Sequence, residues 1–218
     1  MDFFNKTYEK HLLSPVTLGQ KEIWLMQQLS PHLSFNISEH AEIIGDLNVS
    51  LFEQAVNDVI AETPGLNSRF AVVEGDLYQF TDNKIPEGLH VIDINGNFSE
   101  SFDLEAWVQK DITTLASVED AQLYNFSLLC LPMSKFIFYY RCHHVLMDGR
   151  SMATISKRIC EQYDCLIAGQ VPEDKLSPSF GLQAKNDIDY LQSKRFLADE
   201  AFWGNIAVKK QVQIGYHS

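Results

Sequence analysis

The 218-residue chain lacks the features of several common protein classes. Lysine and arginine number 17 against 29 acidic residues, and the formal net charge of −12 repels nucleic acid and anionic lipid. A glycine-rich phosphate-binding loop and a Gly-x-Ser-x-Gly elbow are both absent, so nucleotide-dependent and serine-hydrolase chemistry have no support. No apolar run has the length of a membrane span, and the first residues do not form a signal peptide. We therefore expect a soluble, cytoplasmic protein that binds neither nucleic acid nor membrane.

Cysteine is also scarce. The four cysteines fall in no metal-binding or redox spacing, and three of them lie in apolar patterns where free thiols pack. This usage predicts reduced thiols and no metal site. What the chain does have is apolar content, 45% hydrophobic and 11% aromatic, which is enough to bury a core.

The order of apolar patterns predicts an α/β fold. Two capping boxes, Thr17-x-x-Gln20 and Ser50-x-x-Glu53, predict the starts of helices that end near Leu29 and before Pro64. Strands are predicted over residues 35–44, 66–73, 77–81, 90–94, 122–131 and 135–143. Further helices are predicted over residues 101–115 (with Leu104, Trp107, Val108 and Leu115 inward), 151–168, 180–190 and 196–203.

Residues 169–178 have the composition of a linker, with two prolines, a glycine and several charges. The sequence therefore predicts one unit over 1–170, a linker over 171–178 and a second unit that begins at 179. The last 40 residues, 179–218, are too few for a core of their own, so we expect them to pack on something outside this chain.

The segment 135–151 is the most informative part of the sequence. An apolar strand brings two adjacent histidines to its end, and a short loop with Asp148 and Gly149 follows before a helix. Neighbouring strand residues point to opposite faces, which argues against a shared metal and for separate roles. We expect His144 to be a general base, since imidazole titrates near neutral pH, and His143 to be a core histidine with backbone partners.

Two other residues of this segment invite chemical interpretations. We expect Asp148 to be a structural clamp beside the buried Arg141 rather than a catalyst. A nucleophilic pair of Cys142 and His144 is disfavoured, because β-carbons two residues apart on a strand are about 7 Å from each other.

Residues 143–149, His-His-Val-Leu-Met-Asp-Gly, fit the His-His-x-x-x-Asp-Gly motif of condensation domains from nonribosomal peptide synthetases, a superfamily that resembles chloramphenicol acetyltransferase in fold. Residues 17–24 resemble the family's first motif, Ser-x-Ala-Gln-x-Arg-Leu-Trp, and residues 66–70 resemble the second, His-Glu-x-Leu-Arg-Thr-x-Phe. Residues 187–193 and 202–203 are similar to the opening of the family's second lobe. The resemblance implies an amino-terminal lobe over 1–170, with a mixed, mostly antiparallel sheet flanked by helices, and an incomplete carboxy-terminal lobe over 179–218.

Three departures from the family pattern stand out. Glu22 replaces the arginine of the first motif, while Thr63-Pro64 replaces the His-Glu of the second and Asn67 replaces its arginine. In the family that last arginine pairs with the motif aspartate. The remaining candidates to hold Asp148 are Arg69, on the same predicted strand, and Arg141.

The resemblance implies amide formation between an acyl thioester and an aminoacyl thioester, both tethered to carrier proteins. His144 would act as base or positioner, and the Gly149 backbone N–H would stabilise the oxyanion. No cofactor is bound directly, because the 4′-phosphopantetheine arms belong to partner carrier domains, and adjacent synthetase domains are further partners. The arms need a tunnel between two lobes, so the isolated chain is expected to be inactive.

Three alternatives remain open at this point. The chain can belong to a coenzyme A-dependent acyltransferase of the same superfamily, to an epimerisation domain, or to a catalytically silent module that docks a carrier protein. The doubled histidine favours condensation, since the stand-alone acyltransferases generally carry only the second one.

Overall fold

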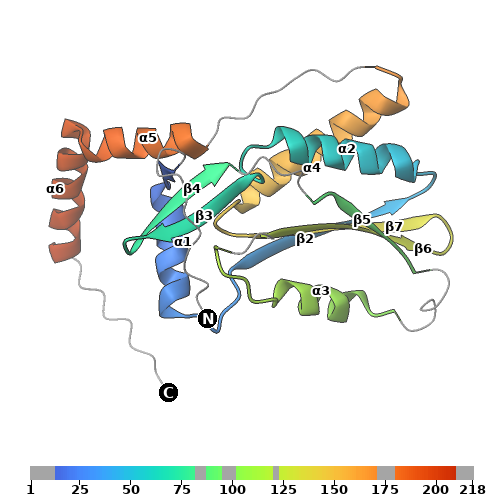
Figure 1. Ribbon diagram of the computed structural model, residues 1–218, viewed down its shortest axis with the longest axis horizontal. Coiled ribbons are helices and arrows are strands. Elements are labelled where there is room, and N and C mark those ends of the chain that lie inside the picture. The colour runs from blue at the N-terminus through green and yellow to red at the C-terminus, as the bar shows by residue number, and fades with distance from the viewer. Residues whose placement is uncertain (1–12, 82–86, 95–101, 120–122, 171–179, 210–218) are drawn as a thin grey trace.

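The computed structural model describes residues 13–81, 87–94, 102–119, 123–170 and 180–209 (Figure 1). The elements in chain order are β1 (Ser14–Pro15), α1 (Leu18–Leu29), β2 (Asn36–Ile44), α2 (Val49–Glu62), β3 (Ser68–Val73), β4 (Asp76–Thr81), β5 (Leu89–Asp93), α3 (Leu104–Ile112), β6 (Tyr124–Leu131), β7 (Lys135–His143), α4 (Gly149–Ile167), α5 (Phe180–Leu191) and α6 (Lys194–Lys209). None of the helices in these ranges is both long and apolar enough to cross a membrane.

The larger sheet has the strand order β2-β7-β6-β5 and positions the histidines. Strands β2, β7 and β6 are antiparallel, and β5 runs parallel to β6. Helices α2 and α4 cover one face and α3 covers the other (Figure 1). The prediction of a mixed, mostly antiparallel sheet flanked by helices is confirmed.

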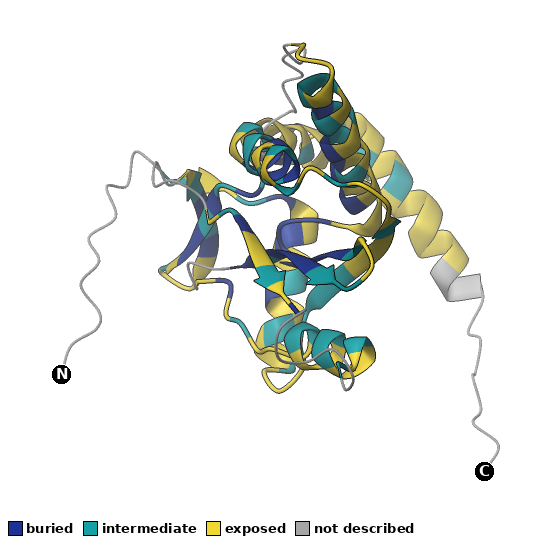
Figure 2. Cartoon of the chain, turned by 90° about the vertical axis from the view of Figure 1, so that its right-hand side faces the viewer, coloured by how far each residue is buried: buried dark blue, intermediate teal, exposed yellow. Residues whose placement is uncertain are grey.

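Strand β7 lies inside this sheet and is buried from residue 137 to 143. On the α2 side, Phe138 packs edge-on against Phe52, with ring centroids 5.2 Å apart. On the α3 side, Tyr139 packs edge-on against Trp107 at 4.9 Å. Figure 2 shows buried residues gathered on the strands and on the inward faces of the helices, so apolar layers hold the strand that ends at the histidines.

The smaller sheet, β1-β4-β3, is antiparallel. Its β3–β4 hairpin turns at Glu74 and Gly75, which both have positive φ, 54° and 86°, as a twisted two-residue hairpin turn requires. Helix α5 packs beside β1: Ala184 is buried there, and Asp187 Oδ2 accepts the Leu18 N–H at 2.9 Å. Helix α5 thus contacts β1 and the first residue of α1.

Two details of the sequence prediction were wrong. The N-cap of α2 is Asn48, whose side chain accepts the Leu51 N–H at 3.1 Å, and not Ser50. Helix α3 ends at Ile112, so Leu115 lies beyond it and is exposed instead of inward. The predicted linker, 171–178, lies outside the described residues.

Candidate active site

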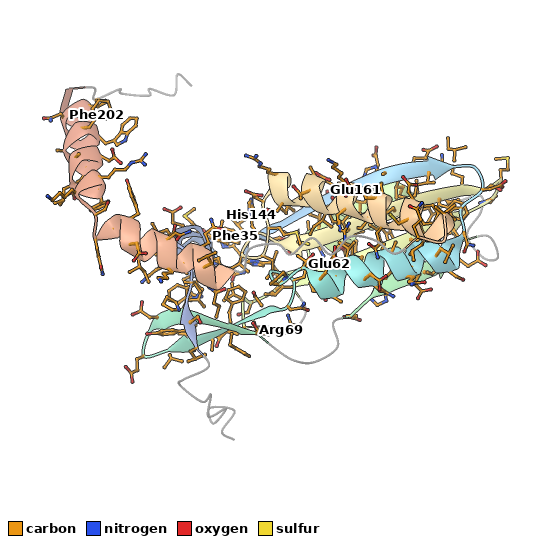
Figure 3. All side chains as sticks on the ribbon, turned by 90° about the horizontal axis from the view of Figure 1, so that it is seen from above. Phe35, Glu62, Arg69, His144, Glu161 and Phe202 are labelled. Atoms are coloured by element: carbon orange, nitrogen blue, oxygen red, sulfur yellow. The ribbon has the colours of Figure 1, made fainter. Side chains whose placement is uncertain are left out.

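The backbone at the end of β7 fixes both histidines. The His143 N–H donates to the Leu123 carbonyl at 2.7 Å, and the His144 N–H donates to the Phe35 carbonyl at 2.8 Å. The two histidines are therefore held between the segments that flank β6 and β2. The side chain of His144 is exposed in this chain, and Figure 3 shows it near Phe35, at the end of the helical layer.

The ring of His143 is buried, with 1% of its surface exposed. Its Nδ1 accepts the Val145 N–H at 3.1 Å, so a neutral ring carries its proton on Nε2. That Nε2 lies 3.3 Å from the side-chain amide nitrogen of Gln27, and this amide donates to the Ala116 carbonyl at 2.6 Å. His143 thus shapes the turn that presents His144.

Gln20 holds the other side of this turn. Its Nε2 donates to the Val145 carbonyl at 3.3 Å, while its Oε1 accepts the Thr17 N–H at 2.9 Å. The side chain is buried, and the Gln20 backbone N–H in turn donates to Thr17 Oγ1 at 3.2 Å. The capping box that the sequence predicts is present, but its second function, a hydrogen bond to the histidine loop, was missed because the two segments are 125 residues apart.

Asp148 caps the first turn of α4. Its Oδ1 accepts the Ser151 N–H at 2.8 Å and the Ser151 Oγ–H at 2.7 Å. These hydrogen bonds hold the pKa of the Asp148 carboxyl below its usual value. The loop that carries His144 is therefore anchored to α4 through a serine.

The two arginines considered for Asp148 have other contacts. Arg141 Nε donates to Asp111 Oδ2 at 2.7 Å, on the α3 side of the sheet. Arg69 Nη1 donates to the carbonyls of Leu66 and Ser68, and Figure 3 shows Arg69 on β3, apart from His144. Arg141 is thus engaged by Asp111 and not by Asp148.

Gly149 is the first residue of α4. The N–H groups in the first turn of a helix have no acceptor within the helix, and the helix dipole adds partial positive charge there. A Cβ at Gly149 would meet no atom within 4 Å, so the space on the side-chain side of this residue is open. Gly149 does not itself line the pocket at His144 described next.

His144 borders a pocket of about 300 Å³, here named the histidine pocket. Its lining comes from the start of α1, from the loop 144–148 with Ser151 in the first turn of α4, and from Gln183 of α5. Glu22, one of the departures from the family pattern, lines it together with Asp148. Two acidic side chains therefore share the pocket with the imidazole.

Cys142 is not a nucleophile for this pocket. It is fully buried, and burial raises the pKa of its thiol to about 12, so the thiol stays protonated near neutral pH. Within the ranges that the structure describes, no three His, Cys, Asp or Glu side chains are grouped to hold a metal ion.

A mixed sheet covered by helices, with a His-His-x-x-x-Asp-Gly loop at the end of its central strand, defines the class of the condensation domains. The family model described as Condensation domain matches residues 11–214, and the chain belongs to this family.

Curated relatives and solved structures agree with this assignment. A dimodular nonribosomal peptide synthase of Bacillus subtilis is 31% identical over 195 residues, which cover 89% of this chain and 8% of the synthase. Enterobactin synthase component F of Escherichia coli O157:H7 is 27% identical, covering 87% of this chain and 15% of its own length. The starter condensation domain of rhizomide synthetase, in a mutant complex with C8-CoA, superposes with a TM-score of 0.84 at 26% identity over 91% of this chain and 46% of that one. The chain thus spans about half of that solved condensation domain.

Proposed function

We propose that this chain is the amino-terminal lobe of a condensation domain and supplies the histidine for amide formation between two carrier-bound thioesters. The observation that supports the proposal most directly is the position of His144: its backbone is fixed at the end of the central strand, and its side chain opens onto a pocket. The relatives named above include a dimodular nonribosomal peptide synthase.

The chemistry follows from the groups at the end of β7. The α-amine of the acceptor has a pKa near 8, so part of it is neutral and nucleophilic at cellular pH. The amine nitrogen attacks the thioester carbon, and His144 accepts the proton of the ammonium that forms or orients the amine. The Gly149 N–H stabilises the oxyanion; the C–S bond then breaks, and the departing thiolate takes up the proton released by the ammonium and leaves as a thiol.

The substrates arrive on 4′-phosphopantetheine arms of carrier proteins, and adjacent synthetase domains are the remaining partners. Residues 1–170 form the amino-terminal lobe, 171–178 the linker, and 179–218 the start of the second lobe. Because such arms require a channel between two lobes, the 218-residue chain alone is inactive or nearly so.

The test of this proposal compares dipeptide formation with loaded carrier proteins by the 218-residue chain and by the same chain joined to a carboxy-terminal lobe. We expect turnover only in the joined form, and His144→Ala to lower its kcat by about 10² or more, as for loss of a general base. His40→Ala, which removes an exposed histidine on β2, is the matched control and should change nothing. Turnover by the 218-residue chain alone, or full activity of His144→Ala, contradicts the proposal.

The oxyanion role of Gly149 has its own pair of variants in the joined form. Gly149→Pro deletes the N–H at a helix position where proline fits, and Asp148, with φ −112° and ψ 175°, tolerates a following proline. We expect kcat to fall about 10²-fold, whereas Gly149→Ala keeps the N–H and meets no clash. Equal activity of the two variants would remove Gly149 from the mechanism.

One observation favours a second candidate, an acyl donor delivered as a coenzyme A thioester. The similar rhizomide synthetase domain is described in complex with C8-CoA. The joined form should then use octanoyl-CoA as readily as an octanoyl-carrier protein. A catalytically silent docking module, by contrast, would retain all its carrier binding and function in His144→Ala.

A further inference from the structure

A second and larger hollow, of about 450 Å³, lies where the carboxy-terminal end of α2, the first half of α4 and the start of α5 meet. We name it the α2–α4 pocket. Its floor is apolar: Val59 and Ile155 come from the two helices, and Leu146 and Met147 come from the histidine loop. Nothing in the proposed mechanism uses this space.

The charged groups at its rim are paired with one another. Arg158 Nε lies 2.6 Å from Glu62 Oε1 and Arg158 Nη2 lies 3.2 Å from Oε2, a two-point pair between α4 and α2. Glu161 approaches the same guanidinium at 3.9 Å and the Lys157 ammonium at 3.7 Å. Figure 3 shows Glu62 and Glu161 on these two neighbouring helices. A rim whose charges neutralise each other does not favour a charged ligand, so an apolar one fits best.

The lining also contains two of the positions where this sequence departs from the family pattern. Thr63 and Pro64, which stand in place of His-Glu, both border the pocket. Two residues without charge therefore replace a pair that can carry charges of opposite sign. The departure makes the wall less polar at this point.

The α2–α4 pocket adjoins the histidine pocket. Both are lined by Leu146, Met147, Ser151 and Gln183, so these four residues form the boundary between the two pockets. The larger pocket has a volume typical of small-molecule sites. The α2–α4 pocket therefore offers space for a substituent of a substrate whose carbonyl lies at His144.

We propose that the α2–α4 pocket takes a large apolar substituent of the thioester substrate, an acyl chain or a bulky amino-acid side chain, whose reacting carbonyl lies at His144. This inference rests on the proposed function, because that function places the carbonyl. Its consequence is that the chain prefers substrates with long or bulky apolar groups over small ones.

The first experiment measures binding to the 218-residue chain by titration calorimetry. One series consists of acetyl, butanoyl, hexanoyl and octanoyl thioesters of N-acetylcysteamine, and the other of alanyl, leucyl and phenylalanyl thioesters. We expect affinity to rise about fourfold with each buried methylene in one of the series. A rise in the acyl series assigns the pocket to the donor, and a rise in the aminoacyl series assigns it to the acceptor. Flat affinities in both series overturn the proposal.

The second experiment locates the binding. Thr154→Trp, on the exposed surface of α4, fills the pocket and should abolish the dependence on chain length, whereas the matched control Thr154→Ser should retain it. Gln183→Trp fills the same space from α5, so the test does not depend on one variant alone. Circular dichroism shows whether each variant is folded. An unchanged dependence in folded Thr154→Trp and Gln183→Trp shows that the substituent binds elsewhere, and the proposal fails.

The two proposals fail in different ways. If turnover by the joined form depends on His144 but affinity ignores chain length, the pocket assignment alone is wrong. If affinity follows chain length and Thr154→Trp abolishes that dependence, while His144→Ala keeps full turnover, the catalytic proposal alone is wrong.

Discussion

At the scale of single residues, Gln20 joins two parts of the site that are far apart in sequence. Its carboxamide oxygen completes the capping box of α1, and its nitrogen donates to the carbonyl next to His144. A buried group that uses both ends in this way cannot shift without leaving one partner unpaired. Gln20 is therefore a positioning residue for the histidine loop.

Gln20→Glu separates the two functions. A carboxylate still accepts the Thr17 N–H, but it cannot donate to Val145 and places negative charge against that carbonyl. In the form joined to a second lobe we expect kcat to fall about tenfold with KM little changed, because the loop moves while the pocket remains.

Thr17→Ala is the control for Gln20→Glu. It removes the side-chain cap of α1, which costs about 1 kcal/mol of stability, and leaves the bond to Val145 in place. If Thr17→Ala lowers kcat as much as Gln20→Glu does, the activity depends on the cap of α1 and not on the hydrogen bond to Val145.

At the scale of elements, the Asp111 carboxylate on α3 links that helix to three side chains of the sheet. Asp111 accepts hydrogen bonds from Tyr139 Oη at 2.7 Å, Arg141 Nε at 2.7 Å and Asn125 Nδ2 at 3.3 Å. Asp111→Ala leaves the buried guanidinium without its carboxylate, and we expect the free energy of unfolding to drop by about 3 kcal/mol in urea denaturation. Lys135→Ala, which breaks the exposed pair with Glu42, should cost less than about 1 kcal/mol. Equal costs would mean that the Asp111 network is not a structural anchor.

Strands β6 and β7 also contribute to the dependence of the free energy of unfolding on pH. Tyr124 and Cys142 face each other across these strands, and burial raises the pKa of each to about 12, from 10.0 and 9.0. The folded chain keeps both protons to higher pH than the unfolded chain does. Their contribution to stability is therefore complete below pH 9 and is lost as the pH rises from 9 toward 12.

Cys142→Val tests this alkaline dependence. The urea midpoint of the unaltered chain should fall between pH 8 and pH 10.5, and the variant, which has no proton to lose there, should fall less steeply. Cys165→Ser, at a partly buried position on α4, should keep the slope of the unaltered chain. Identical slopes in all three proteins would exclude Cys142 as a source of the effect.

How far the sequence predicts these elements depends on the range of the interactions. The strands 35–44 and 135–143 follow from local apolar patterns, and the hairpin turn follows from its glycine. The N-cap of α2 does not follow from the local sequence, because Asn48 and Ser50 both satisfy the residue preference for an N-cap. Only the path of the backbone in the folded chain selects Asn48. Partners such as Gln20 for the Val145 carbonyl or Asp111 for Arg141 lie 125 and 30 residues away, and no spacing rule predicts them.

At the scale of the whole molecule, the carboxy-terminal helices are apolar on surfaces that this chain leaves open. Leu197, Phe202 and Trp203 on α6 are exposed, the last at 64% of its surface, and α6 extends beyond both sheets (Figure 1). Figure 3, which labels Phe202, shows the same arrangement from above. An apolar helix face of this kind is a contact surface for another part of a protein, and the proposed second lobe is the occupant we expect.

Trp203 reports directly on that contact. The other two tryptophans, Trp24 and Trp107, already pack in the described part of the chain, so covering α6 should change the fluorescence of Trp203 above all. In the 218-residue chain we expect red-shifted emission, strong binding of an apolar dye and self-association as the concentration rises. Joining the carboxy-terminal lobe should shift the emission to the blue and reduce dye binding, and Trp203→Phe should remove most of the shift. If the emission of the joined form matches that of the 218-residue chain, the second lobe does not cover α6, because a desolvated indole cannot keep the spectrum of a solvated one.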